Sequence, residues 1–143
     1  MDAAAPVRPT AIISVNGLIE QLAELDGQPV QVEGILVLQP EGYELQHYPK
    51  SERLTAHTLL DSEYRPGVWI AFGDGGLKPN HGTLERWIGK RVRVVGIVKT
   101  IVSLSPVGAL GRGGFGPWGF WPVQIEPYSV QRVTADERRE EQA

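Results

Sequence analysis

Two segments of the chain repeat one pattern 62 positions apart, and this repeat constrains the fold more than any other feature. Residues 27–35 read GQPVQVEGI and residues 89–97 read GKRVRVVGI. Apolar and polar residues alternate in each copy, which is the two-residue period of a half-buried strand. Each copy then places a glycine, Gly34 or Gly96, where an inward side chain is due. A glycine weakens a strand unless the strand must bend sharply or let another backbone approach.

Beyond each glycine, both faces of the strand become apolar. The first copy continues as ILVL over 35–38, and the second continues as IV over 97–98. Two strands that bend at a glycine and then bury both faces predict a small, strongly coiled barrel rather than a flat sheet. Two copies at this distance are too few and too far apart for a solenoid.

A helical pattern precedes each copy of the repeat. Three leucines at helical spacing predict a helix over 14–25, with Ser14 or Asn16 as its N-cap. Residues 82–89 predict a second, shorter helix, which Gly89 ends.

Three further strands are expected in the rest of the chain. Alternation predicts them over 42–48, 68–72 and 121–133, and the two prolines of the last one demand an edge position or a bulge. The long connections between these elements cover 49–66, where a short helix is one option, and the glycine-rich 103–120.

The resulting order is three strands, a helix and two strands, which is the order of the five-stranded OB-fold barrel. The chain resembles the stand-alone bacterial OB-fold proteins over about residues 14–133. The likeness rests on the capped helix, LDGQPVQVEG at 25–34, a Trp-Ile strand and GKRVRVVG at 89–96. We therefore expect an all-β, OB-fold-like Greek-key barrel with an N-terminal helix and a helix between the third and fourth strands. The matching residues build the fold, so the resemblance implies little about activity.

Composition limits the classes of function. A chain of 143 residues is one domain, which we place at 12–134 between tails at 1–11 and 135–143. The absence of cysteine excludes disulfides, thiolate-bound zinc and a cysteine nucleophile. A net charge of −3 gives no overall electrostatic attraction to duplex nucleic acid or to an anionic membrane. Neither a signal peptide nor a membrane span is evident, so we expect a cytoplasmic protein.

Catalytic motifs are not apparent. The three histidines, His47, His57 and His81, have no partners at metal-ligand spacing, and no nucleophile motif occurs. The GDGG turn at 73–76 lacks the Gly-Lys-Ser/Thr of a phosphate loop. We expect no enzyme, no metal and no cofactor; a hydrolase built from the loop histidines is the remaining alternative.

Strand parity indicates one candidate binding face. If Val68 and Ile70 point inward, Trp69 points outward, and the same parity turns Tyr48 outward beside Glu44. OB-folds bind ligands on this face, and single-strand binders use aromatic side chains there as stacking platforms. Such binders also need a basic groove. The outward basic residues of the fourth expected strand lie on the wrong edge and predict a solvated face: Arg91, Arg93 and Lys99.

The loop at 108–122 is the second candidate. It combines glycines with large apolar groups and one arginine, and its candidate binding residues are Arg112, Phe115, Trp118 and Phe120. Its RGGF segment is superficially like the RGG repeats of RNA-binding proteins, but it occurs once. Either the loop plugs the barrel mouth, or it is a partner-binding surface anchored by Trp118 and Arg112.

Two functions therefore compete. The first is a non-enzymatic OB-fold module that binds another protein, for example as an immunity- or antitoxin-like inhibitor of a toxin. The alternative is weak binding of single-stranded DNA or RNA through Trp69, Tyr48 and Arg112.

Overall fold

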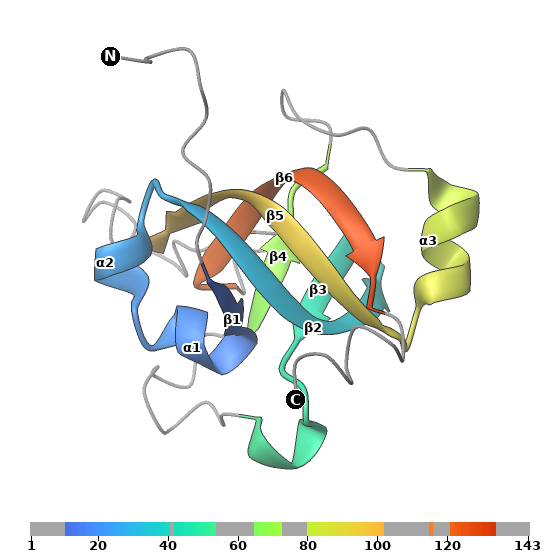
Figure 1. Ribbon diagram of the computed structural model, residues 1–143, viewed down its shortest axis with the longest axis horizontal. Helices are drawn as coiled ribbons and strands as arrows, with labels where there is room; N and C mark the ends of the chain where they lie inside the picture. The colour runs from blue at the N-terminus through green and yellow to red at the C-terminus, as the bar shows by residue number, and fades with distance from the viewer. Residues whose placement is uncertain are drawn as a thin grey trace.

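Six strands and four short helices make up the part of the chain that the computed structural model describes, residues 11–40, 42–53, 65–72, 80–101, 115 and 121–133 (Figure 1). The N-terminal half holds β1 (Ile12–Ser14), α1 (Val15–Ile19), α2 (Leu22–Leu25), β2 (Pro29–Gln39), β3 (Gly42–Gln46) and the 3₁₀ turn η1 (Lys50–Glu52). The C-terminal half holds β4 (Gly67–Ile70), α3 (His81–Trp87), β5 (Arg91–Thr100) and β6 (Val123–Arg132).

Five of the strands close into a barrel. Their order is β2-β3-β4-β6-β5, and β5 pairs back with β2. The β4–β6 pairing is parallel and the other four are antiparallel. The expected OB-fold-like barrel, with α3 between its third and fourth strands, is therefore confirmed. A sixth strand, β1, was not expected from the sequence and pairs in parallel with β2.

The two copies of the repeat lie against each other in the β2–β5 ladder. Val32 pairs with Val94, its own counterpart in the second copy. The paired positions are symmetric about this point, Gly34 with Val92 and Val30 with Gly96. The repeat therefore builds a local twofold axis through the barrel wall.

The symmetry extends to the ends of both strands. Gly27 and Gly89 occupy matching positions and both adopt a positive φ, +79° and +81°. Each donates its backbone N–H to the opposite strand, Gly27 to the Val98 carbonyl (2.7 Å) and Gly89 to the Leu36 carbonyl (2.8 Å). A positive φ favours glycine, because a Cβ would collide with the following carbonyl.

Gly34 and Gly96 lie where the wall is most crowded. At Gly34, β2 changes its partner from β5 to β3, and an added Cβ would lie closer than 3.0 Å to the Gln46 carbonyl oxygen. At Gly96, an added Cβ would come equally close to the Glu126 carbonyl oxygen. The β5–β6 register shifts beside Gly96, opposite Pro127, which agrees with a bulge, one of the two options expected from the prolines.

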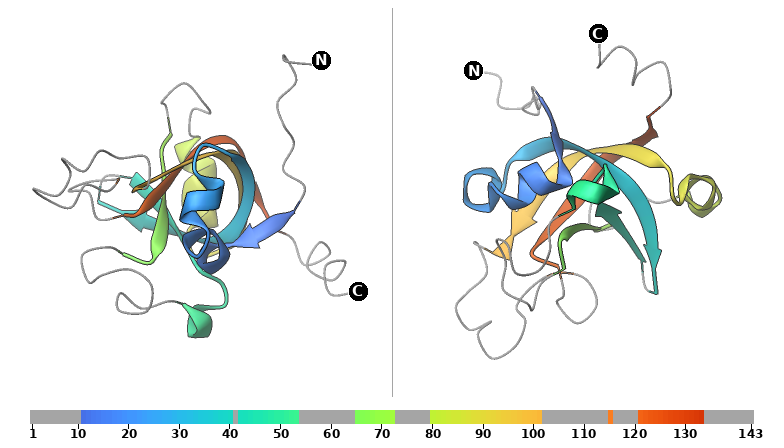
Figure 2. Two further views of the ribbon diagram at one scale, coloured as in Figure 1. Left: turned by 90° about the vertical axis from the view of Figure 1, so that its left-hand side faces the viewer. Right: turned by 90° about the horizontal axis from the view of Figure 1, so that it is seen from below.

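Helices cover the two ends of the barrel (Figures 1 and 2). Val15 and Leu18 of α1 are fully buried at one end, and Leu84 of α3 is buried at the other. The apolar centre between them comes from the inward residues of all five barrel strands. Within the described residues, no helix is both long and apolar enough to cross a membrane.

The prediction of one continuous helix over 14–25 is wrong. Ser14 caps α1 as expected, since its Oγ accepts the Gly17 N–H at 3.0 Å. The helix is then interrupted at Gln21, where the backbone leaves helical geometry (φ −126°, ψ 33°). This break redirects the chain so that Gly27, after α2, reaches the end of β5.

Candidate functional site: an arginine–glutamate cluster beside a surface pocket

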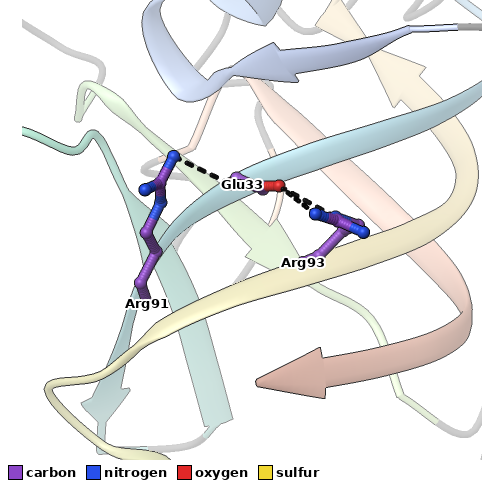
Figure 3. Close-up of polar contacts among 3 residues, drawn as sticks. All are labelled: Glu33, Arg91 and Arg93. Carbon is purple, nitrogen blue, oxygen red and sulfur yellow. Dashed lines mark hydrogen bonds and ion pairs between the residues drawn. The ribbon is translucent and has the colours of Figure 1, made fainter. Parts of the chain in front are cut away.

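The β2–β5 ladder brings one acidic and two basic side chains together on the outside of the barrel. Glu33 pairs in register with Arg93, and Arg91 lies two positions earlier on β5 with the same outward parity. Arg93 contacts Glu33 Oε2 through Nε and Nη2, both at 2.8 Å. Arg91 Nη2 lies 2.9 Å from the other oxygen, Oε1, so the carboxylate is held between two guanidinium groups (Figure 3).

The cluster is largely shielded from solvent. The Glu33 side chain is 5% exposed, and those of Arg91 and Arg93 are 20% and 19% exposed. The solvated face expected for these two arginines is therefore wrong, because Glu33 draws both side chains onto the barrel wall. The expectation fits Lys99 better, since its side chain is 54% exposed and pairs with Glu126 at 2.9 Å.

A pocket of about 280 Å³ opens beside the cluster. Its lining comes from β1, β2, β5 and the second residue after the end of β3: Ile12, Ile13, Ser14, Glu33, Tyr48 and Arg91. The Tyr48 ring is half exposed, and the Arg91 guanidinium carbon lies 4.8 Å from its centroid. This distance is within the range of a cation–π contact, which is electrostatically favourable for a guanidinium. The pocket thus combines an aliphatic wall, an aromatic ring and a fixed cation.

The expected stacking face of β3 and β4 is covered by the chain itself. Trp69 does point outward, but it is 9% exposed and packs against Trp121, with ring centroids 4.6 Å apart. The Arg65 guanidinium lies 5.4 Å from the Trp121 ring centroid. The prediction of an exposed platform at Trp69 is therefore wrong, and exposed Tyr48 lies beside Arg91 instead.

Beneath Trp121, the Glu44 carboxylate is fully buried. It accepts hydrogen bonds from Trp121 Nε1 at 2.9 Å and from the side-chain amides of Gln39 and Gln46. Gly67 leaves room for this carboxylate, because an added Cβ would overlap Glu44 Oε2. These three donors satisfy a group whose burial would otherwise be strongly unfavourable.

The described part of the glycine-rich loop belongs to this cover. Phe115 forms an antiparallel bridge with Trp121, with backbone N–H to carbonyl distances of 2.7 and 3.1 Å. Its side chain packs against the cluster of Trp69, Ala71 and Trp121, on the outer face of β4. The other candidate residues of the loop lie outside the described residues, Arg112, Trp118 and Phe120.

His47 is buried and has a structural contact. Its Nδ1 accepts the backbone N–H of Asn16 at 3.2 Å. Burial lowers the pKa of His47 below its ordinary value, while the nearby carboxylates of Glu52 and Glu20 oppose this shift. Among the described residues, no three histidine, aspartate or glutamate side chains are placed to hold a metal ion, and His57 lies outside this part of the chain.

Sequence reasoning missed Glu33 and the three residues of β1 as parts of a site. Glu33 was one polar position in an alternating strand, and a three-residue strand leaves no periodic signal. One usable signal was nevertheless present in the repeat. If its two copies pair antiparallel about Val32 and Val94, Glu33 must face Arg93.

Comparison with known protein families and with curated protein sequences finds no match. Within the described residues, the fold and the two faces define a small closed β-barrel in which the chain covers the outer face of β3 and β4, and in which a pocket opens beside the arginine–glutamate cluster. Its function has to be argued from that pocket.

Proposed function

We propose that this chain is a non-enzymatic binding module and that it binds another protein at the pocket formed by β1, Tyr48 and the arginine–glutamate cluster. The observation that carries the proposal is the pocket itself. It places half-exposed Ile12 and Tyr48 beside a guanidinium that is already held in position by Glu33. Tyrosine and arginine are the residue types that most often anchor protein interfaces, and a fixed side chain loses less entropy on binding.

The narrower form of this proposal is an immunity- or antitoxin-like inhibitor in the cytoplasm. The small size and the net charge of −3 favour a soluble partner over an anionic surface.

Binding of single-stranded nucleic acid is the second candidate. Its aromatic platform has less support, because Trp69 is covered by Trp121 while Glu44 occupies the adjacent position. Tyr48 and the two arginines of β5 are the features that still favour it.

Affinity capture from a native lysate, with and without nuclease, tests the proposal. The bait would be the wild-type protein, Tyr48→Ala in the pocket, and Tyr128→Ala as a matched control. Tyr128 is a similarly exposed tyrosine on β6 and does not line the pocket. We expect one protein to be retained by the wild type and by Tyr128→Ala, and retention to fall about tenfold or more with Tyr48→Ala.

Capture that disappears after nuclease treatment would contradict the proposal, as would equal losses in both tyrosine variants. A labelled oligonucleotide titration covers the second candidate directly. A Kd tighter than about 10⁻⁶ M at physiological salt would favour nucleic acid, because nonspecific contacts seldom reach that affinity.

A further inference from the structure

We infer that His47 is a pH-sensitive switch of the pocket: protonation of its ring releases the contact that holds β1 and Tyr48 together, and partner binding then weakens. This inference rests on the proposed function and adds the regulation of the same site. It comes from the position of His47 between two sides of the pocket, from its tautomer and from the acidic groups near it.

His47 joins two sides of the pocket. On one side, Ser14 lines the pocket and caps α1, since its Oγ accepts the Gly17 N–H at 3.0 Å. Asn16 lies within this turn and donates its backbone N–H to His47 Nδ1 at 3.2 Å. On the other side, Tyr48 directly follows His47 and also lines the pocket. The hydrogen bond therefore ties the corner between β1 and α1 to the segment that carries Tyr48.

This hydrogen bond fixes the protonation state of the ring. Because Nδ1 accepts a proton, the ring is neutral and carries its own proton on Nε2. The residue is 5% exposed, and Nε2 is buried without an acceptor among the described residues. A second proton would place an N–H on Nδ1 directly against the N–H of Asn16. Two donors cannot form a hydrogen bond with each other, so the charged ring has to leave this position.

The charged ring has carboxylates nearby. Neither β1 nor α1 contains a charged residue, but Glu20 follows α1 and Glu52 lies on η1, and both carboxylates favour the charged form of His47. η1 lies next to α1, since the Asn16 side-chain amide donates to the Glu52 carbonyl at 2.6 Å (Figure 2). A neutral ring bound to Asn16 and a charged ring turned toward these carboxylates are two discrete arrangements, which is what a switch requires.

The direction of the switch follows from burial. Burial is the largest influence on the pKa of His47 and lowers it from an ordinary value of 6.5, while Glu52 and Glu20 oppose this shift. The arrangement with the neutral ring is therefore fully favoured above about pH 6.5 and is lost as the pH falls below that value. Further charged side chains are described on η1, directly after it, on β3 and in the arginine–glutamate cluster: Lys50, Arg53, Glu44, Glu33, Arg91 and Arg93.

Proton NMR titration of the free full-length chain between about pH 7.5 and about pH 5 tests the inference without a partner. In the variant His47→Asn, a side-chain oxygen can accept the Asn16 N–H without titrating. Glu52→Gln removes a carboxylate that favours the charged ring. His81→Asn is the control, because His81 is an exposed histidine on α3 that does not line the pocket. Circular dichroism and cooperative thermal unfolding would show that each variant is folded.

In the wild type at about pH 7.5, we expect a through-space contact between the Asn16 amide proton and the His47 ring. This contact should be lost on acidification, with the same midpoint, below pH 6.5, as the protonation of the ring. The signals of Ser14 and Tyr48 should shift with that midpoint, because both residues adjoin the contact. The cross-strand contacts between β2 and β5 should stay, which distinguishes opening of the pocket from unfolding.

The variants separate the switch from a general effect of acid. His47→Asn should abolish the changes at Ser14 and Tyr48, and His81→Asn should leave them as they are. Glu52→Gln should move their midpoint to lower pH, because the charged ring loses a favourable neighbour. If His47→Asn does not fold, the shift expected from Glu52→Gln still decides.

Capture of the partner from the lysate at about pH 7.5 and about pH 5.5 tests the regulation. The apparent Kd of the retained protein should rise at the lower pH by at most about tenfold, because one proton is taken up by a group whose pKa lies below 6.5. The rise should be absent with His47→Asn and unchanged with His81→Asn.

A His47 ring that becomes protonated while the Asn16 contact persists would overturn the inference and leave the proposed function standing. A ring that stays neutral down to about pH 5 would do the same, as would an equal rise of the Kd in the wild type and in His47→Asn. Opening of the pocket in the free chain, with no protein captured at either pH, would instead contradict the proposed function.

Discussion

At Gly34 and Gly96, the space next to the backbone is already filled by a carbonyl oxygen of a neighbouring strand. The positions match in the two copies of the repeat, so the same local requirement arises twice in one barrel wall. Both glycines allow the backbone of a neighbouring strand to approach closely. Neither has a positive φ, so glycine is needed here for space and not for backbone conformation.

The substitutions Gly34→Ala and Gly96→Ala should therefore each destabilise the fold. Overpacking in a well-packed interior costs about 1–3 kcal/mol, and backbone atoms yield less than side chains, so we expect about 3 kcal/mol or more for each variant. Urea unfolding monitored by tryptophan fluorescence measures this loss.

Gly82→Ala is the matched control for both variants. This glycine lies inside α3, where an added Cβ has its nearest neighbour at 3.5 Å, and alanine is the better helix former. It should stabilise the protein by up to about 1 kcal/mol. An unchanged midpoint in either strand variant would contradict the role given to these glycines.

The buried imidazole of His47 predicts a pH dependence of stability. Its pKa is lowered in the folded protein from an ordinary value of 6.5, so the unfolded chain binds more protons in the window below that value. Protonation of Nδ1 would also remove the hydrogen bond from the Asn16 N–H. The contribution of neutral His47 to the free energy of unfolding should thus be fully present above about pH 6.5. It should decrease as the pH drops below that value, by at most about 1.4 kcal/mol per pH unit.

Urea unfolding at about pH 7.5 and about pH 5.5 checks this expectation, with His47→Asn as the comparison. The asparagine side-chain oxygen can accept the same N–H without titrating. We expect a smaller loss of stability on acidification in the variant; an equal loss in both proteins would assign the pH dependence to other groups.

At the level of elements, the cover over β3 and β4 depends on one buried carboxylate. Glu44 on β3 receives the indole N–H of Trp121, which precedes β6, so the contact joins two strands that are not neighbours in the barrel. Trp121→Phe keeps an aromatic ring and removes this donor. It should cost about 1–3 kcal/mol, because the remaining carboxylate oxygen loses a partner without gaining water.

A double-mutant cycle with Glu44→Leu isolates this interaction, because leucine cannot accept the indole N–H. The coupling energy between the two positions should be at least about 1 kcal/mol, since the atoms are in direct contact and shielded from solvent. Phe115→Leu serves as the control, because Phe115 packs in the same cluster without bonding Glu44. Additive effects of Trp121→Phe and Glu44→Leu would contradict the contact.

The elements also show what local patterns can and cannot predict. Alternation, glycine bends and caps predicted all five barrel strands and α3, because those signals act within one segment. They missed β1, whose three residues pair with β2 but have no period of their own. They also predicted the outward direction of Trp69 without its burial, since Trp121 reaches it from a distant part of the chain.

At the scale of the whole molecule, one sequence repeat accounts for most of the architecture. The two copies pair with each other, and a helix before each copy covers one end of the barrel. The glycines at matching positions either adopt a positive φ before the strand or allow a neighbouring backbone to approach closely. The site arises where this symmetry fails. Glu33 corresponds to Val95 in the second copy, so only one half of the twofold has an acid to hold the arginines.

The candidate site was therefore less predictable than the fold. Strand parity placed Arg91 and Arg93 outside the barrel, but their partner and the pocket depend on the pairing of β1, β2 and β5. Such pairings join residues far apart in sequence, for which a single chain offers no periodic signal. The internal repeat is the exception, because its symmetry restricts the register.

Measurement of through-space proton contacts by NMR in the free protein tests the account most directly. The account predicts cross-strand contacts between Val32 and Val94, which place Glu33 opposite Arg93, together with contacts between Trp69 and Gln124 that close the barrel. Helical contacts within 29–35 or 91–97, or an open sheet without the Trp69–Gln124 contact, would contradict it.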